Sequence, residues 1–121
     1  MNKSIKCRAA VLFDMSLPRP FSESKPVKVE EIELDPPGYG EVLVKVSAAG
    51  LCHSDLSVVN GNRPRAMPMV LGHEGSGIVK ALGEGVDNFQ IGDHVVFVFV
   101  PSCGNCIPCK EGRPALCDPG L

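Results

Sequence analysis

The chain has 121 residues, which is the size of one ordinary domain. Hydrophobic residues make up 44% of it but aromatic residues only 5%, so its core depends on aliphatic side chains. The formal net charge is −2 and no basic run occurs, which argues against nucleic acid and acidic membrane surfaces as partners.

The apolar runs are also short. The longest of them, 95–100, is far too short to span a bilayer, and Asp14 ends the apolar run near the N-terminus before it could serve as a secretory signal. We therefore expect a cytoplasmic protein that does not associate with membranes. In that reducing compartment, clustered cysteines favour metal binding over disulfides.

The predicted elements are mostly strands. In chain order we expect strands over 5–13, 28–34 and 41–46, a short helix over 54–59, and strands over 75–82 and 94–100. The apolar phase changes within 28–34, which predicts a bulge there. Glycine and proline punctuate the connections, and the strand spacing predicts a small barrel or sandwich.

From Pro101 onward cysteine, glycine and proline replace the strand pattern, so this segment needs a cross-link or a metal ion in place of a hydrophobic core. Its cysteines are Cys103, Cys106, Cys109 and Cys117. Three cysteines at two-residue gaps can wrap one ion, and a fourth thiolate completes a closed tetrahedral zinc site of the structural type. Disulfides and an iron–sulfur cluster are the alternatives, although the bacterial ferredoxin pattern has a closer fourth cysteine that proline follows.

A second group of metal-binding residue types lies earlier in the chain. Cys52-His53-Ser54-Asp55 follows a predicted strand, and Gly72-His73-Glu74-Gly75 precedes another. Each motif alone is a weak signal, because a lone cysteine is more often a core residue than a ligand. The glycines let the backbone approach a crowded centre closely.

Together these motifs, with Gly92-Asp93-His94-Val95 between them and the quartet, resemble the zinc-dependent alcohol dehydrogenases of the medium-chain dehydrogenase family. The likeness runs from about Ile5 to the end of the chain. It implies a mainly β, GroES-like catalytic domain over 1–121, a partly open β-barrel with short helices and a zinc-binding lobe at about 101–121. It also implies oxidation of small alcohols to aldehydes or ketones with NAD or NADP, in a homodimer or homotetramer.

The resemblance implies a role for each matching residue. Cys52 and His73 would bind a catalytic zinc ion, and Glu74 would lie beside the metal. Asp55 would fix the tautomer of His73, and Ser54 would contact the alcohol and pass on its proton. His53 would lie near the cofactor pyrophosphate.

Three features depart from the family pattern. Ser57 stands where a histidine often continues the proton path. The later cysteine that is the family's third protein ligand of the catalytic zinc does not occur in the 121 residues, and neither does the G-x-G-x-x-G fingerprint of a Rossmann cofactor domain. We therefore expect a catalytic-domain fragment that is inactive alone. A non-enzymatic, zinc-stapled GroES-like assembly module and a fragment of a polyol or threonine dehydrogenase relative are the alternatives.

Overall fold

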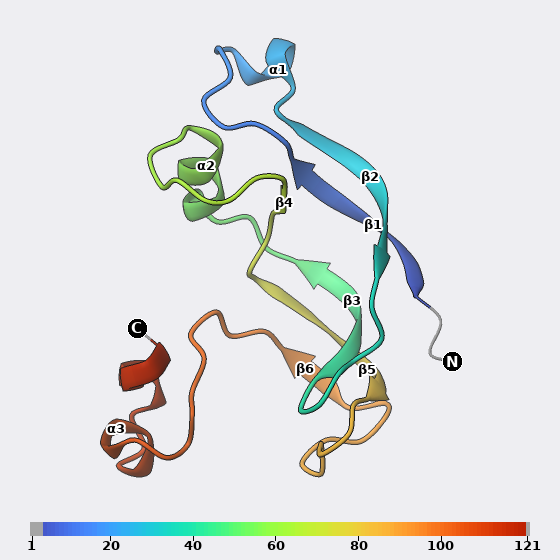
Figure 1. The fold of residues 1–121 in the computed structure, drawn as a ribbon, viewed down its shortest axis with the longest axis vertical. Coiled ribbons are helices and arrows are strands. Elements are labelled where there is room, and N and C mark those ends of the chain that lie inside the picture. The colour runs from blue at the N-terminus through green and yellow to red at the C-terminus, as the bar shows by residue number, and fades with distance from the viewer. Residues whose placement is uncertain (1–3, 121) are drawn as a thin grey trace.

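The computed structural model describes residues 4–120 and contains two open three-stranded sheets with short helices (Figure 1). The strand orders are β2-β1-β4 in the first sheet and β3-β5-β6 in the second, and all the pairs are antiparallel. The expected mainly β, partly open architecture is confirmed.

The first sheet is built on β1 (Ile5–Leu12) and β2 (Val27–Leu34). They pair without a break from Ile5 opposite Leu34 to Leu12 opposite Val27, so the bulge predicted within 28–34 was wrong. The reason is burial: Ile32 alone in β2 is even partly buried, so neither apolar phase has to face a core and the register stays continuous. The short strand β4 (Met69–Val70), which the sequence did not predict, pairs with the end of β1.

In the second sheet β3 (Val42–Ala49) pairs with β5 (Gly75–Leu82), and their register shifts at two places. The strands approach closely at Gly77, where a Cβ atom would lie 2.3 Å from the Lys45 carbonyl oxygen. The strand β6 (His94–Val96) is shorter than the predicted 94–100. The chain leaves the sheet after Phe97, whose N–H still donates to the Gly75 carbonyl at 2.8 Å.

The buried core lies beneath the helix α2 (His53–Val59), close to the predicted 54–59. Val58 and Val59 of this helix pack on Leu12 of β1, which is fully buried. Partly buried side chains surround them, including Phe21 of the short helix α1 (Phe21–Ser24). The core therefore holds the last turn of α2 against the first sheet, and Cys52 to Asp55 lie at the opposite end of this short helix.

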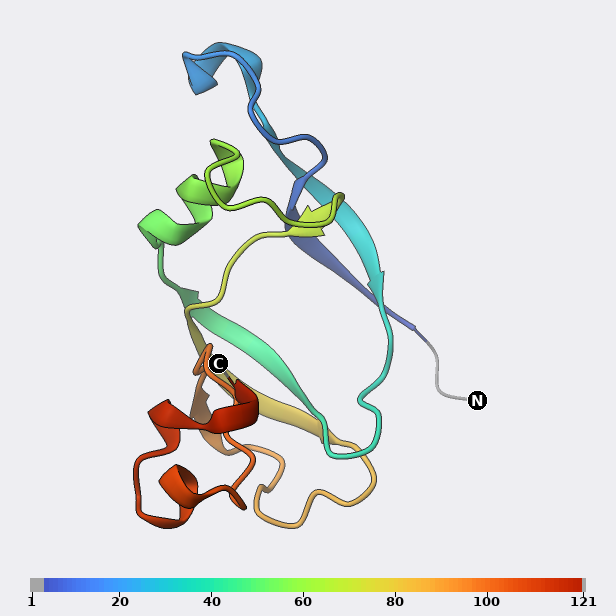
Figure 2. The same cartoon turned by 60° about the vertical axis from the view of Figure 1, so that its left-hand side comes forward.

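The C-terminal segment forms a separate lobe below α2 (Figure 2). It contains the helix α3 (Ile107–Lys110) and two 3₁₀ turns, Pro114–Leu116 and Asp118–Gly120. Its buried centre is Cys117, which is 1% exposed. Within residues 4–120 no helix is long and apolar enough to cross a membrane.

Candidate metal centres

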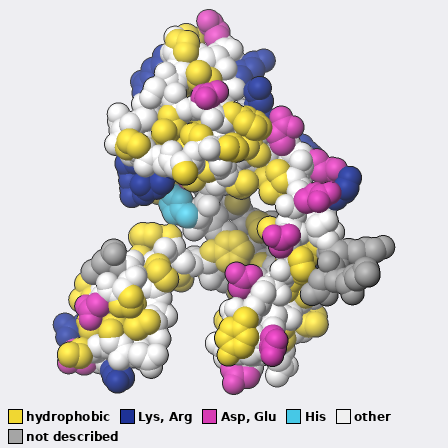
Figure 3. Space-filling view, viewed as in Figure 1, with side chains coloured by type: hydrophobic (Ala, Val, Ile, Leu, Met, Phe, Trp, Pro, Cys, Tyr) yellow, Lys and Arg dark blue, Asp and Glu magenta, His cyan; other side chains and the backbone are white. Residues whose placement is uncertain are grey.

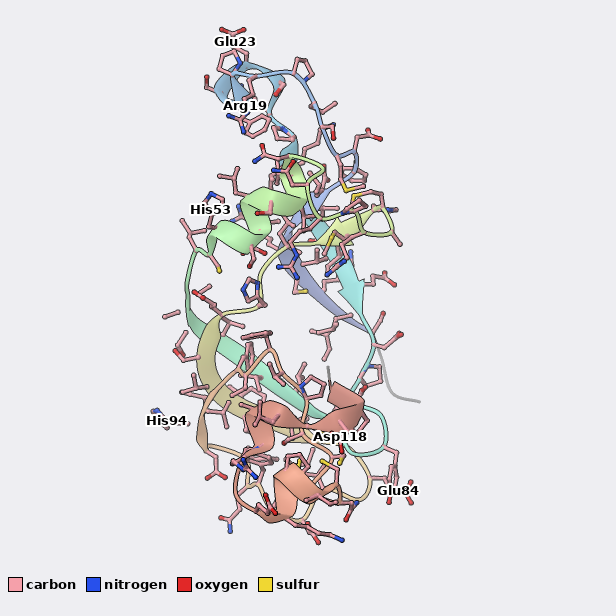
Figure 4. The ribbon with its side chains drawn as sticks, turned by 90° about the vertical axis from the view of Figure 1, so that its left-hand side faces the viewer. Arg19, Glu23, His53, Glu84, His94 and Asp118 are labelled. Carbon is pink, nitrogen blue, oxygen red and sulfur yellow. The ribbon has the colours of Figure 1, made fainter. Side chains whose placement is uncertain are left out.

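The four cysteines of the C-terminal lobe converge on one point. Their Sγ atoms all lie within 4.8 Å of one another, and no disulfide links any cysteine in the described part of the chain. Figure 4 shows sulfur atoms gathered in this lobe near Asp118. In a tetrahedral zinc site with Zn–S distances of about 2.3 Å the sulfur atoms are about 3.8 Å apart, so the quartet fits such an ion.

Backbone turns and hydrogen bonds shape this cluster. Gly104 and Gly112 have φ values of 73° and 77°, which is the region that glycine occupies without strain. The Sγ atom of Cys103 accepts the N–H groups of Asn105 at 3.4 Å and Cys106 at 3.3 Å, and Cys117 Sγ accepts the N–H of Cys103 at 3.2 Å. These N–H groups stabilise sulfur in its ionised, metal-binding form.

The surroundings of Cys103 and Cys109 shift their pKa values in opposite directions. Backbone N–H groups of Asn105 and Cys106 lower the pKa of Cys103 to about 6. Desolvation and the neighbouring Cys106 thiol raise the pKa of Cys109 to about 12. Thiols this close cannot all ionise without a cation, because like charges disfavour one another. A divalent cation among them would favour the thiolate form of each cysteine.

The second cluster joins the start of α2 to the loop before β5. Cys52, His73 and Glu74 each present a possible ligand atom, and these atoms also lie within 4.8 Å of one another. Three protein donors leave a fourth tetrahedral position free, which is the pattern of a catalytic metal site. Gly50 makes room for Glu74, because a Cβ atom at Gly50 would lie 2.4 Å from the Glu74 Oε2 atom.

Ser54 and Asp55 contact this cluster from the first turn of α2. The Ser54 hydroxyl lies 3.1 Å from Cys52 Sγ and 3.1 Å from His73 Nε2. The Asp55 Oδ1 atom lies 3.3 Å from His73 Nδ1 and also accepts the Gly72 N–H at 3.3 Å. Asp55 therefore holds Nδ1, which leaves Nε2 directed toward Cys52 and Ser54.

The hydrogen bonds of the cluster shift two pKa values in opposite directions. Bonds from the hydroxyl and the backbone N–H of Ser54 lower the pKa of the Cys52 thiol. The hydrogen bond with Cys52 and the charge of Asp55 raise the pKa of His73. Both shifts favour a negatively charged sulfur beside a proton-holding imidazole, a charge distribution in which a metal ion could replace the proton.

A cleft of about 440 Å³ opens over this cluster, and the space-filling view shows a hollow beside a histidine with basic side chains at its edge (Figure 3). Met69 lines the cleft. Phe99, Arg63 and Arg65 also line it, and the sequence did not predict them there. The Phe99 ring meets the His73 ring edge-on, with the centroids 6.0 Å apart. Phe99 comes from the segment expected to continue β6, so no local pattern could have placed it.

His53 and Ser57 lie outside the cluster of metal-binding residue types. His53 is exposed at the first position of α2, and its side chain points away from the ribbon (Figure 4). The Ser57 hydroxyl donates to the His53 carbonyl at 3.1 Å. Ser57 is thus bonded to the helix backbone rather than to Ser54.

Comparison with known proteins gives these clusters a context. Residues 38–121 match the alcohol dehydrogenase GroES-like domain. The chain belongs to this family. It is 47% identical to the NDMA-dependent alcohol dehydrogenase of Amycolatopsis methanolica, over 96% of this chain and 29% of that protein.

Solved structures of alcohol dehydrogenases share the fold. Benzyl alcohol dehydrogenase from Acinetobacter calcoaceticus is 38% identical with a TM-score of 0.79, over 96% of this chain and 30% of that one. A cobalt- and zinc-bound thermostable alcohol dehydrogenase from Pyrobaculum aerophilum is 34% identical with a TM-score of 0.77, over 96% of this chain and 33% of that one. The chain thus spans about a third of each relative, and the resemblance to zinc-dependent alcohol dehydrogenases is confirmed.

Proposed function

We propose that this GroES-like domain supplies the catalytic metal site and the substrate cleft of a zinc-dependent alcohol dehydrogenase. The observation that carries the proposal is the meeting of Cys52, His73 and Glu74 in a cleft, with the Ser54 hydroxyl 3.1 Å from two of them. The substrate is a small alcohol or aldehyde. The parent protein uses NAD or NADP, and the support for this cofactor is the family relationship.

We propose that the quartet in the lobe holds a structural zinc ion. All four positions of that ion would be filled by sulfur, so the site is closed to substrate. The ion would hold together a segment whose single fully buried side chain among the described residues is Cys117. Stability of the lobe would then depend on the metal.

In the second site Cys52 and His73 would bind zinc through Sγ and Nε2, with Glu74 as a neighbouring third donor. When bound, such an ion acts as a Lewis acid that makes an alcohol hydroxyl easier to deprotonate. Ser54 is placed to accept that proton and pass it outward without carrying a charge into the cleft. Asp55 holds the His73 ring in the ligand orientation. Val58, Met69 and Phe99 line the cleft with apolar side chains.

Two residues of α2 concern the cofactor side of the site and the outer proton path. His53, exposed at the start of α2, is the residue we propose for contact with the cofactor pyrophosphate. The hydroxyl of Ser57 is bonded to the helix, so we propose that the outer proton path runs through water or another group. We further propose that the parent protein is cytoplasmic, because none of the described cysteines is in a disulfide. On the family resemblance we propose that it assembles as a homodimer or homotetramer.

The position of Glu74 favours a second candidate. Its carboxylate belongs to the donor set of the cluster, and polyol and threonine dehydrogenase relatives can use a glutamate next to the histidine as a ligand. Such a relative would share the zinc sites and differ in substrate. The assembly-module alternative gains no support, because it has no use for Cys52, His73 and Asp55 placed together.

Zinc titration of the metal-free chain against a competing chelator tests the proposal. We expect one tight site and one weak site, because the quartet is complete and the second cluster has fewer sulfur ligands. Cys106→Ser should abolish the tight site and Cys52→Ser the weak one. Cys7→Ser, outside both clusters, should change neither. A weak site that persists in Cys52→Ser would contradict the proposal, and so would two equally tight sites.

A further inference from the structure

Two arginines line the cleft beside the second metal cluster. Arg63 and Arg65 lie in the segment between α2 and β4, and both contribute to the same cleft as Cys52 and His73. Within residues 4–120 neither guanidinium forms an ion pair with a carboxylate. The cleft therefore has two positive charges that the described part of the protein does not neutralise.

The carboxylates of the cleft already have other partners. Asp55 accepts hydrogen bonds from His73 and from the Gly72 N–H. Glu74 belongs to the donor set of the metal cluster. Since both acidic groups serve the metal side of the cleft, the two exposed guanidinium groups are available to bind an anion from outside.

The backbone that carries the arginines is fixed at both ends. The Arg63 N–H donates to the Ser57 carbonyl at 3.1 Å, which ties the start of the segment to α2. At its other end β4 pairs with β1. Between the two arginines Pro64 restricts the backbone, and its carbonyl accepts a hydrogen bond from Arg65 Nη1 at 3.1 Å. This order reduces the entropy that binding a ligand would cost.

We propose that Arg63 and Arg65 bind an anionic end of the substrate. The alcohol taken by this domain then carries a carboxylate or phosphate group at the end remote from its hydroxyl. A guanidinium group binds either anion through paired N–H donors. The apolar walls formed by Val58, Met69 and Phe99 fit a short aliphatic body between the two ends. This inference rests on the proposed function, because it assigns the hydroxyl end to the metal cluster.

The test compares three probes on the zinc-loaded chain by NMR chemical-shift titration. The probes are 4-hydroxybutyrate, 3-hydroxypropyl phosphate and uncharged 1-butanol, and the two anions distinguish a carboxylate from a phosphate preference. We expect at least one anion to bind about tenfold more tightly than butanol at low salt, with a preference that falls as ionic strength rises. Arg63→Gln combined with Arg65→Gln should remove that preference. Arg8→Gln, which removes an arginine of β1 outside the cleft, should retain it.

Equal affinities for the charged and uncharged probes would overturn the inference, and so would a preference that survives the double arginine variant. The absence of binding by any probe would overturn it as well. Zinc content measured on the same samples separates this failure from that of the proposed function. A chain that holds both zinc ions yet shows no charge preference counts against the arginine assignment alone. A chain without zinc at Cys52 and His73 counts against the function on which the assignment rests.

Discussion

Replacement of Asp55 by asparagine tests the organisation of the second metal cluster. Asparagine keeps the shape of the side chain but removes the charge that faces His73 Nδ1, and its amide has two orientations of which only one presents oxygen to that nitrogen. Hydrogen-bond partners of a metal-binding histidine contribute about 10- to 100-fold to metal affinity. Both bonds to Asp55 are 3.3 Å long and its side chain is 22% exposed, so the lower end of that range applies.

We therefore expect Asp55→Asn to weaken zinc binding at the second site about tenfold, or about 1.4 kcal/mol. The assay is chelator competition on a chain whose quartet is already loaded, so that the weak site is measured by itself. Asp87→Asn is the matched control, because Asp87 is exposed and outside both metal clusters. An Asp55→Asn affinity within twofold of the unsubstituted chain would refute the positioning role, and an equal loss in Asp87→Asn would reduce it to an effect of net charge.

Two further predictions concern the core and the quartet. Leu12→Ala should lower the free energy of unfolding, measured by urea denaturation, by about 2–5 kcal/mol, because it leaves a cavity beneath Val58 and Val59. The control Leu51→Ala, at a fully exposed position, should change this free energy by less than about 0.5 kcal/mol. In the metal-free chain Cys103 should react with iodoacetamide at pH 7 and half-maximally near its pKa of about 6. Because folding depresses this pKa, the thiolate stabilises the fold above the unfolded pKa, and that contribution is lost as pH falls through about 6. Labelling that begins only above pH 8 would contradict the lowered pKa of Cys103. Labelling that zinc does not suppress would contradict its assignment as a metal ligand.

The sequence could predict those parts of the protein in which spacing alone limits the geometry. The quartet is local: four cysteines within 103–117 and two left-handed glycines can reach one point whatever the rest of the chain does. The pairing of Cys52 with His73 is long-range, and it was predicted only through family resemblance. In the structure it depends on contacts distant in sequence, such as the packing of Leu12 in β1 on Val58 and Val59 of α2.

The failures of prediction have the same physical origin. The bulge expected within 28–34 rested on apolar periodicity, but β2 is exposed along most of its length, so periodicity carried no packing information there. The apolar segment after β6 does not extend the sheet, and its Phe99 instead meets His73 in the cleft. Arg63 and Arg65 gave no signal, since arginines in a loop are ordinary until the fold places them beside a metal cluster.

X-ray absorption at the zinc edge tests most directly whether the lobe is built around a metal. The sample is the chain loaded with one equivalent of zinc, which the tight site should take up completely. Four sulfur scatterers at about 2.3 Å are expected, with no nitrogen or oxygen neighbour. Fewer than four sulfur neighbours, or thiol titration that shows the lobe cysteines joined in pairs, would contradict the account.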